Sequence, residues 1–165
     1  MIRLVVPMTL KPVKKWYVSF VLIPFALYYI FTRGQYTLID NIDLIIHEAG
    51  HFFFGFFGDF IHMAGGTLMQ ILFPLFLAWY FYRNGYRAGV QIFIFWLGQN
   101  LINISVYAAD ANKLKLKLIG GRHDWLYLLN KLGLLRSADE VGYFFFSLAI
   151  LVFIISIILP FRYSK

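Results

Sequence analysis

Five apolar runs, separated by charged or glycine-rich stretches, constrain this chain more than any other feature. They cover residues 16–31, 38–57, 67–82, 89–109 and 141–160. A bilayer offers the backbone no hydrogen-bond partners, and runs of this length satisfy their own backbone groups as helices. With 61% hydrophobic and 14% charged residues, the sequence predicts an all-α integral membrane protein. We expect residues 1–165 to form a single polytopic domain, a bundle of about five transmembrane helices.

Basic residues flank the apolar runs. Arg3, Lys11, Lys14 and Lys15 precede the first run, which ends without a small-residue cleavage site, so we expect an uncleaved span. The net charge of +7 is spread around the runs and does not form one basic face, which favours anionic lipid over nucleic acid as its partner. If the N-terminus is cytoplasmic and the C-terminus external, ten Lys and Arg residues lie on the cytoplasmic side and five outside, and this excess favours that orientation. We expect the membrane to be the plasma (inner) membrane.

The second run contains a possible metal site, His47-Glu48-Ala49-Gly50-His51. On a helix His47 and His51 lie one turn apart on one face, where two imidazoles can bind one ion, with Glu48 beside them. This is the H-E-x-x-H zinc motif. Because the chain has no Cys, we expect Zn²⁺ to be bound by imidazole and carboxylate groups alone.

The third protein ligand is left open by spacing. We rank His123 first, because Gly120-Gly121 before it would let the connection fold back into the bundle, with Trp125 as an interface anchor. The remaining candidates, in order, are Asp110, then Asp124, then Asp59 and His62.

Further polar residues are expected to support such a site. Asp43 precedes His47 by one turn, placed to accept the second ring proton of His47. In the fourth run, one side of the helix carries Gln99, Asn100, Asn103, Tyr107 and Asp110. A polar stripe in a membrane faces a cavity or another helix. We expect Asn100, Asn103 and Tyr107 to support the metal or position a substrate; ordinary interhelical hydrogen bonding is the alternative.

Two connections have their own patterns. The glycine-rich residues 58–66 predict a tight or re-entrant turn. Residues 110–140 form the longest polar connection, where Lys/Leu alternation over 113–118 predicts a short strand or an extended surface stretch. From Asp124 to Leu135 the pattern predicts a short interfacial helix between the last two spans, with Asp124 as its N-cap.

Over about 20 residues around the motif, the chain resembles the intramembrane zinc metalloproteases of the site-2 protease type. In that family the H-E-x-x-H helix lies within the bilayer, an Asp from a later transmembrane segment completes the zinc site, and membrane-anchored proteins are cut. The resemblance implies His47 and His51 as ligands, Glu48 as general base, and a membrane protein or peptide as substrate. Asp110 is the analogue by position of the family's Asp, although this chain has no Asn-x-x-Pro followed by Asp-Gly.

Chemistry follows from the expected ligands. A zinc ion held by three protein groups keeps an open position for water, whose pKa falls to about 7. Glu48 can then accept the proton of that water and deliver it to a leaving amine. We therefore expect a membrane-embedded zinc metalloprotease; the alternatives are a zinc hydrolase acting on lipids and a non-catalytic metal-binding scaffold. A purely structural zinc site has no need of Glu48 between its ligands, which favours catalysis.

Overall fold

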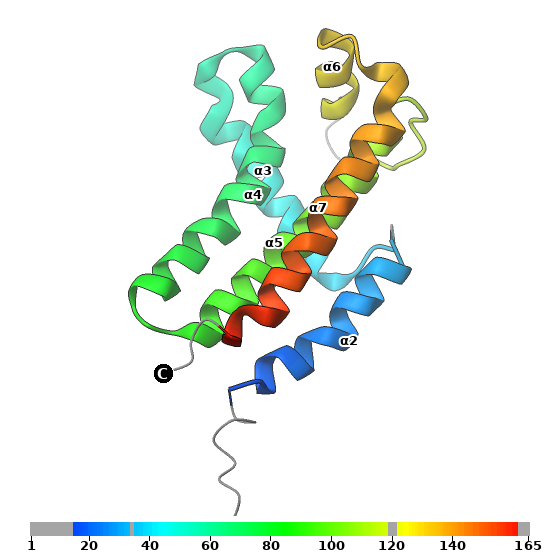
Figure 1. The fold of residues 1–165 in the computed structure, drawn as a ribbon. Coiled ribbons are helices and arrows are strands. Elements are labelled where there is room, and N and C mark those ends of the chain that lie inside the picture. Colours follow the sequence, from blue (N-terminus) through cyan, green and yellow to red (C-terminus); the bar gives the residue numbers. More distant parts are fainter. Residues whose placement is uncertain (1–14, 34, 119–121, 162–165) are drawn as a thin grey trace, which may run out of the picture.

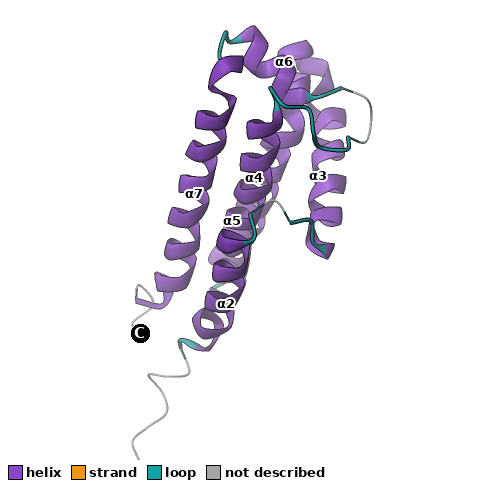
Figure 2. Ribbon diagram, turned by 90° about the vertical axis from the view of Figure 1, so that its right-hand side faces the viewer, coloured by secondary structure: helices purple, strands orange, loops and turns teal. Residues whose placement is uncertain are grey.

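The computed structural model describes residues 15–33, 35–118 and 122–161, which are helical and contain no strand (Figures 1 and 2). The helices are α2 (Tyr17–Phe31), α3 (Leu38–Phe54), α4 (Asp59–Arg83), α5 (Arg87–Asp110), α6 (Asp124–Lys131) and α7 (Ala138–Ile158). Short 3₁₀ turns, Gly55–Phe57, Leu135–Ser137 and Leu159–Phe161, extend α3 and flank α7. The expected all-α class is confirmed, and α6 is the expected short helix between the last two long ones.

Three helical segments are long and apolar enough to cross a membrane. They are α4, α5 and the segment Leu135–Phe161, which contains α7. Helix α2 is apolar but has only 15 residues, about 22 Å of helix. Helix α3 has 17 residues and buries Asp40, Asp43 and His47. Within the described residues, the expected count of five spans is therefore not confirmed.

Side-chain contacts show the direction in which each helix runs. Near the start of α2, Ser19 donates to the Ile157 carbonyl at the end of α7 (2.7 Å) and accepts from Gln91 near the start of α5 (3.0 Å). Just after α2, Arg33 donates to Ser105 in the second half of α5 (3.2 Å). Helix α2 thus runs parallel to α5, and α7 runs antiparallel to both, as Figure 1 shows.

Helix α3 continues in the direction of α2 and does not turn back. It begins with Asp40 beside Asn103, midway along the bundle, and ends next to the start of α4. In Figures 1 and 2, α2 accordingly occupies the lower half of the bundle and α3 the upper half. The rings of Trp16 and Phe161 meet with centroids 4.6 Å apart. The two ends of the described chain therefore lie at one end of the bundle, which does not support the expected placement on opposite sides.

The glycines after the motif pack helices together and do not form the predicted turn. Gly58 alone adopts a turn conformation, with φ of +86°, and α4 starts at the next residue. A Cβ at Gly65 would lie 2.7 Å from the Gly50 carbonyl oxygen, and one at Gly66 would overlap the His47 ring. The expected break over 58–66 is thus wrong beyond Gly58, because Gly65 and Gly66 let α4 approach α3 closely.

The connection before α6 is held by Asp110. Its carboxylate accepts from the backbone N–H groups of Lys115 (2.9 Å) and Leu116 (3.0 Å), so residues 113–118 form an irregular stretch and not a strand. His123, and not Asp124 as expected, is the N-cap of α6, since its Nδ1 accepts from the Leu126 N–H (3.2 Å). The hinge expected at Gly120-Gly121 and the basic residues Arg3, Lys11 and Lys14 lie outside the described residues.

Candidate metal centre

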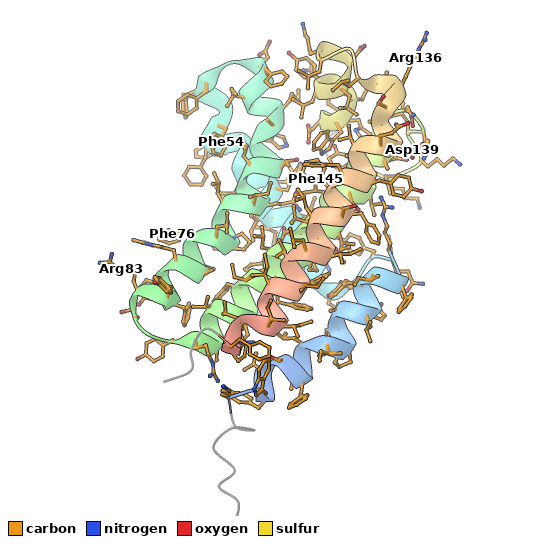
Figure 3. The ribbon with its side chains drawn as sticks, viewed as in Figure 1. Phe54, Phe76, Arg83, Arg136, Asp139 and Phe145 are labelled. Atoms are coloured by element: carbon orange, nitrogen blue, oxygen red, sulfur yellow. The ribbon has the colours of Figure 1, made fainter. Side chains whose placement is uncertain are left out.

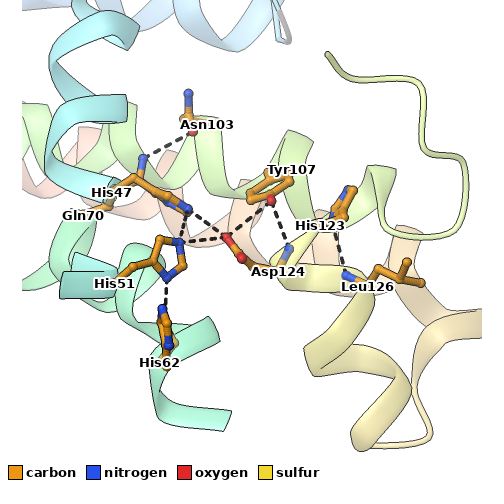
Figure 4. Close-up of polar contacts among 9 residues, drawn as sticks. All are labelled: His47, His51, His62, Gln70, Asn103, Tyr107, His123, Asp124 and Leu126. Atoms are coloured by element: carbon orange, nitrogen blue, oxygen red, sulfur yellow. Dashed lines mark hydrogen bonds and ion pairs between the residues drawn. The ribbon is translucent and has the colours of Figure 1, made fainter. Parts of the chain in front are cut away.

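Three side chains from two helices converge on one point (Figure 4). His47 and His51 project from adjacent turns of α3, and Asp124 projects from the first residue of α6. The Asp124 Oδ2 atom lies 2.9 Å from His47 Nε2 and 3.2 Å from His51 Nε2, and the two Nε2 atoms are 3.2 Å apart. His47 and Asp124 are buried, so the group is largely shielded from solvent.

The other nitrogen of each ring shows which atoms carry protons. His47 Nδ1 lies 3.0 Å from Gln70 Oε1, and His51 Nδ1 lies 2.8 Å from the backbone carbonyl oxygen of His62. Both oxygens accept hydrogen bonds, so each Nδ1 donates and each neutral ring has its lone pair on Nε2. Two lone pairs and a carboxylate oxygen then face one another, an arrangement that requires a cation or added protons between them.

A divalent metal ion fits this triangle. Tetrahedral zinc with ligands at about 2.0–2.1 Å has ligand atoms about 3.3 Å apart, close to the 2.9–3.2 Å between these three. Each imidazole also donates from its other nitrogen, as metal-bound histidines do. His47, His51 and Asp124 can thus hold one metal ion. Two imidazoles and a carboxylate suit zinc and also ferrous iron.

Asp124, ranked third from the sequence, is the carboxylate that the structure brings to the two imidazoles. The ring of His123, ranked first, is turned back to cap α6, and its Nε2 lies 3.5 Å from Asp110 Oδ2. Burial lowers the pKa of His123, which is consistent with a neutral ring that accepts at Nδ1. The Asp110 carboxylate accepts hydrogen bonds from the backbone of the connection before α6 and lies next to the His123 ring. Neither of these two expected ligands is therefore among the three side chains that converge; both contact the connection or the start of α6.

The two lowest-ranked candidates are not part of the converging group. Asp59 is exposed in the first turn of α4. His62 contributes its backbone carbonyl to His51, while its ring lies beside the His51 ring with centroids 5.4 Å apart. Neither side chain is one of the three that converge.

Tyr107 holds Asp124 in place. Its hydroxyl accepts from the Asp124 backbone N–H (3.0 Å) and donates to Asp124 Oδ2 (3.3 Å). Burial raises the pKa of the Asp124 carboxyl, but hydrogen bonds and charge interactions with His47 and His51, made when their Nε2 atoms carry protons in place of a metal ion, lower it by more and leave it well below its usual range. Asp124 is therefore ionised, as a metal ligand must be.

Asp43 does not orient His47 as expected. It is fully buried, and its Oδ1 accepts from the Trp96 indole N–H (2.8 Å). Gln70 takes the place next to His47 Nδ1, because α4 approaches α3 at Gly66 and the Gln70 side chain lies one turn further along α4. Sequence reasoning missed Gln70, although it is the single amide side chain in the apolar run 67–82.

The polar stripe of α5 is divided between two environments. Asn103 and Tyr107 line a cavity beside the centre, with Tyr107 also in contact with Asp124. Asn100 is fully buried and donates to the Trp96 carbonyl within its own helix (3.1 Å), outside the lining of this cavity. The expected supporting role thus fits the positions of Asn103 and Tyr107 and does not fit that of Asn100.

A cavity of about 790 Å³ adjoins the centre, between α2, α3, α4, α5 and the connection before α6. His47, His51 and Asp124 form part of its wall, and Glu48 forms another part. The Glu48 side chain is exposed, and no described residue donates a hydrogen bond to its carboxylate. A molecule in the cavity would therefore meet a free carboxylate and the open side of the three converging atoms.

Comparisons of the chain with protein-family models, with curated proteins and with solved structures found no match.

Proposed function

We propose that this chain is a membrane-embedded zinc hydrolase that cleaves peptide bonds of membrane-associated proteins. One observation carries the proposal: the two histidines of an H-E-x-x-H helix converge with Asp124 in the wall of a large cavity that Glu48 also lines. Three protein ligands leave a fourth position for water or substrate, as in catalytic zinc sites. The three apolar helices α4, α5 and α7 support a location in the membrane.

The catalytic roles follow from the neighbours of each group. A bound zinc ion would lower the pKa of water to about 7 and polarise a scissile carbonyl. Glu48 would accept the water's proton and pass it to the leaving amine, because its carboxylate lines the cavity and is free of hydrogen bonds from the described side chains. Tyr107 would keep Asp124 oriented towards the two imidazoles.

The test is metal analysis of the detergent-purified protein together with a cleavage assay on single-span membrane proteins and on phospholipids. We expect about one zinc ion per chain and cleavage of a membrane protein. Glu48→Gln should keep the metal and lose hydrolysis, since the amide cannot take up the proton. The matched control is Glu140→Gln, because Glu140 is the only other Glu in the chain, is exposed and lies outside the cavity.

Three results would contradict the proposal in different ways. A wild-type protein that binds no zinc would remove the metal site. Full activity in Glu48→Gln would remove the proposed base. Glu48-dependent hydrolysis of phospholipid alone would retain a zinc hydrolase and replace its substrate.

A further inference from the structure

A row of polar side chains, with the amides of Gln70 and Asn103 at its centre, connects His47 to the start of its own helix. His47 Nδ1 contacts Gln70 Oε1 (3.0 Å), Gln70 Nε2 donates to Asn103 Oδ1 (3.3 Å), and Asn103 Nδ2 donates to Asp40 Oδ1 (3.0 Å). Figure 4 shows the Gln70 and Asn103 part of this row. The row passes from α3 to α4, on to α5, and back to α3.

The carboxylate at the far end of the row sets the direction of every bond in it. Asp40 Oδ2 accepts from the backbone N–H and the hydroxyl of Thr37 (2.6 Å each), and Asp40 Oδ1 also accepts from Gln99 (3.1 Å). With two donors on each of its oxygens, this carboxylate acts only as an acceptor in the row. Asn103 must therefore turn its NH₂ group to Asp40 and its oxygen to Gln70.

The same reasoning extends to the imidazole. With its NH₂ group facing Asn103, Gln70 presents its oxygen to His47 Nδ1, so that nitrogen must carry the proton. The lone pair of His47 then lies on Nε2, the atom that faces His51 and Asp124. Flipping either amide would place two acceptors or two donors against each other in the row. Gln70 is 1% exposed and Asp40 is 6% exposed, whereas Asn103 is partly exposed and lines the cavity, so water relieves the conflict least at Gln70.

We propose that Asp40, Asn103 and Gln70 are positioning residues that fix the tautomer and the ring orientation of His47 for metal binding. The inference rests on the proposed zinc site and adds residues on three helices to it. Because Asp40 also caps α3 through Thr37, the same carboxylate holds the start of the helix and, through two amides, its first metal ligand. A bond from Nδ1 to an acceptor also raises the basicity of the coordinating nitrogen.

The experiment measures zinc affinity by chelator competition in the full-length protein in detergent. Gln70→Met removes the acceptor at similar volume, and we expect affinity to fall about 10- to 100-fold. Gln70→Glu keeps an acceptor beside His47 Nδ1, and we expect affinity within about threefold of wild type on that account. Asn103→Leu should weaken binding about tenfold in the wild-type background and have no further effect in the Gln70→Met background, because it acts through Gln70.

Gln91→Met is the matched control. Gln91 is also a fully buried amide on the bundle interior, but it donates to Ser19 (3.0 Å) and to the Ser156 carbonyl (3.0 Å) at the other end of α5. It should lower thermal stability as much as Gln70→Met does and leave zinc affinity unchanged. Loss of zinc affinity in this control would mean that any broken buried amide disturbs the site, and would overturn the inference.

A spectroscopic measurement gives an answer that does not depend on affinity. In zinc-loaded protein with ¹⁵N-labelled histidine, the His47 nitrogen shifts should report a proton on Nδ1 and coordination through Nε2. Asn103→Leu should change that distribution between the two nitrogens, whereas Gln91→Met should not. Three results would each overturn the role of the row and leave the zinc site in place. These are unchanged His47 shifts in Asn103→Leu, unchanged zinc affinity in Gln70→Met, and additive losses of affinity in the double variant. A wild-type protein without zinc would remove the proposed function instead.

Discussion

Asp124 and His123 are neighbours in the chain and have different roles in the structure. The His123 ring folds back onto the N–H of Leu126, so it caps α6 and stacks on Tyr107 with ring centroids 4.4 Å apart. Asp124, one residue later, points from the first turn of α6 towards α3. The start of a helix thus separates two neighbouring side chains that were both candidate ligands from the sequence.

At the residue scale, we predict that Asp124→Ala and His47→Ala each lose most of the bound metal. The remaining two imidazoles are too few to hold zinc tightly. His123→Ala removes a helix cap worth about 1 kcal/mol, so metal binding should weaken only moderately. Metal content after gel filtration measures all three variants, with Asp59→Ala as a control at an exposed carboxylate. A metal-free His123→Ala beside a fully loaded Asp124→Ala would reinstate His123 as the ligand.

Metal binding should also depend on pH. Zinc needs the lone pair of each Nε2, so a proton on either imidazole competes with the metal. The pKa of Asp124 already lies below its usual range, so this carboxylate stays ionised as the pH falls. Affinity should therefore be full at high pH and decline as the pH drops into the range in which imidazoles take up protons. Calorimetry in two buffers should detect proton release on binding below that range, and pH-independent affinity would contradict imidazole ligation.

At the scale of the elements, the pairing of α3 with α4 builds the centre. Gly50, Gly65 and Gly66 bring the two backbones together, which places Gln70 and the His62 carbonyl beside the two imidazoles. The residues that sequence analysis assigned to a turn are thus part of the contact between helices. Glycine in a sequence signals either a backbone turn or a close approach, and only the neighbouring helix distinguishes the two.

We predict that Gly66→Ala weakens zinc binding roughly tenfold or more. Its new Cβ would overlap the His47 ring, and overpacking of this kind costs about 1–3 kcal/mol. Gly55→Ala is the control, because nothing lies within 4 Å of a Cβ at that position and its φ of −60° suits alanine. Chelator competition measures both variants. Equal affinity in Gly66→Ala and Gly55→Ala would show that the α3–α4 contact does not set the position of His47.

At the scale of the whole molecule, the described chain starts and ends at the same end of the bundle. Trp16 contacts Phe161, and α2 and α3 run in the same direction. The described chain therefore runs along the bundle an even number of times, with α2 and α3 together counting as one run and α4, α5 and α7 as one each. Because the metal centre involves α3, α6 and the second half of α5, it lies towards the opposite end, where Arg136, just before α7, also lies (Figure 3).

We predict that Lys15→Cys and Asn84→Cys react with a membrane-impermeant thiol reagent from one side of the membrane, and Arg136→Cys from the other. The chain has no Cys of its own, so each single variant has one thiol and the wild type is the blank. Labelling in oriented vesicles, with and without permeabilisation, gives the answer. If Lys15→Cys and Asn84→Cys react from opposite sides, α2 is a complete crossing and the count of five spans is restored.

The local sequence determined the class of the protein and the first part of the candidate site. Apolar runs determine their own structure, because a backbone in lipid must satisfy its own hydrogen bonds, and the i, i+4 spacing of His47 and His51 sets them on one face of any helix that contains them. Tertiary structure decided the rest. Asp124 lies 77 residues from His47, and whether it, His123 or Asp110 reaches the imidazoles depends on how α6 is capped. Gln70 and the direction of α3 depend on how closely α4 and α5 approach it. These are contacts between distant segments, and no periodicity within one segment encodes them.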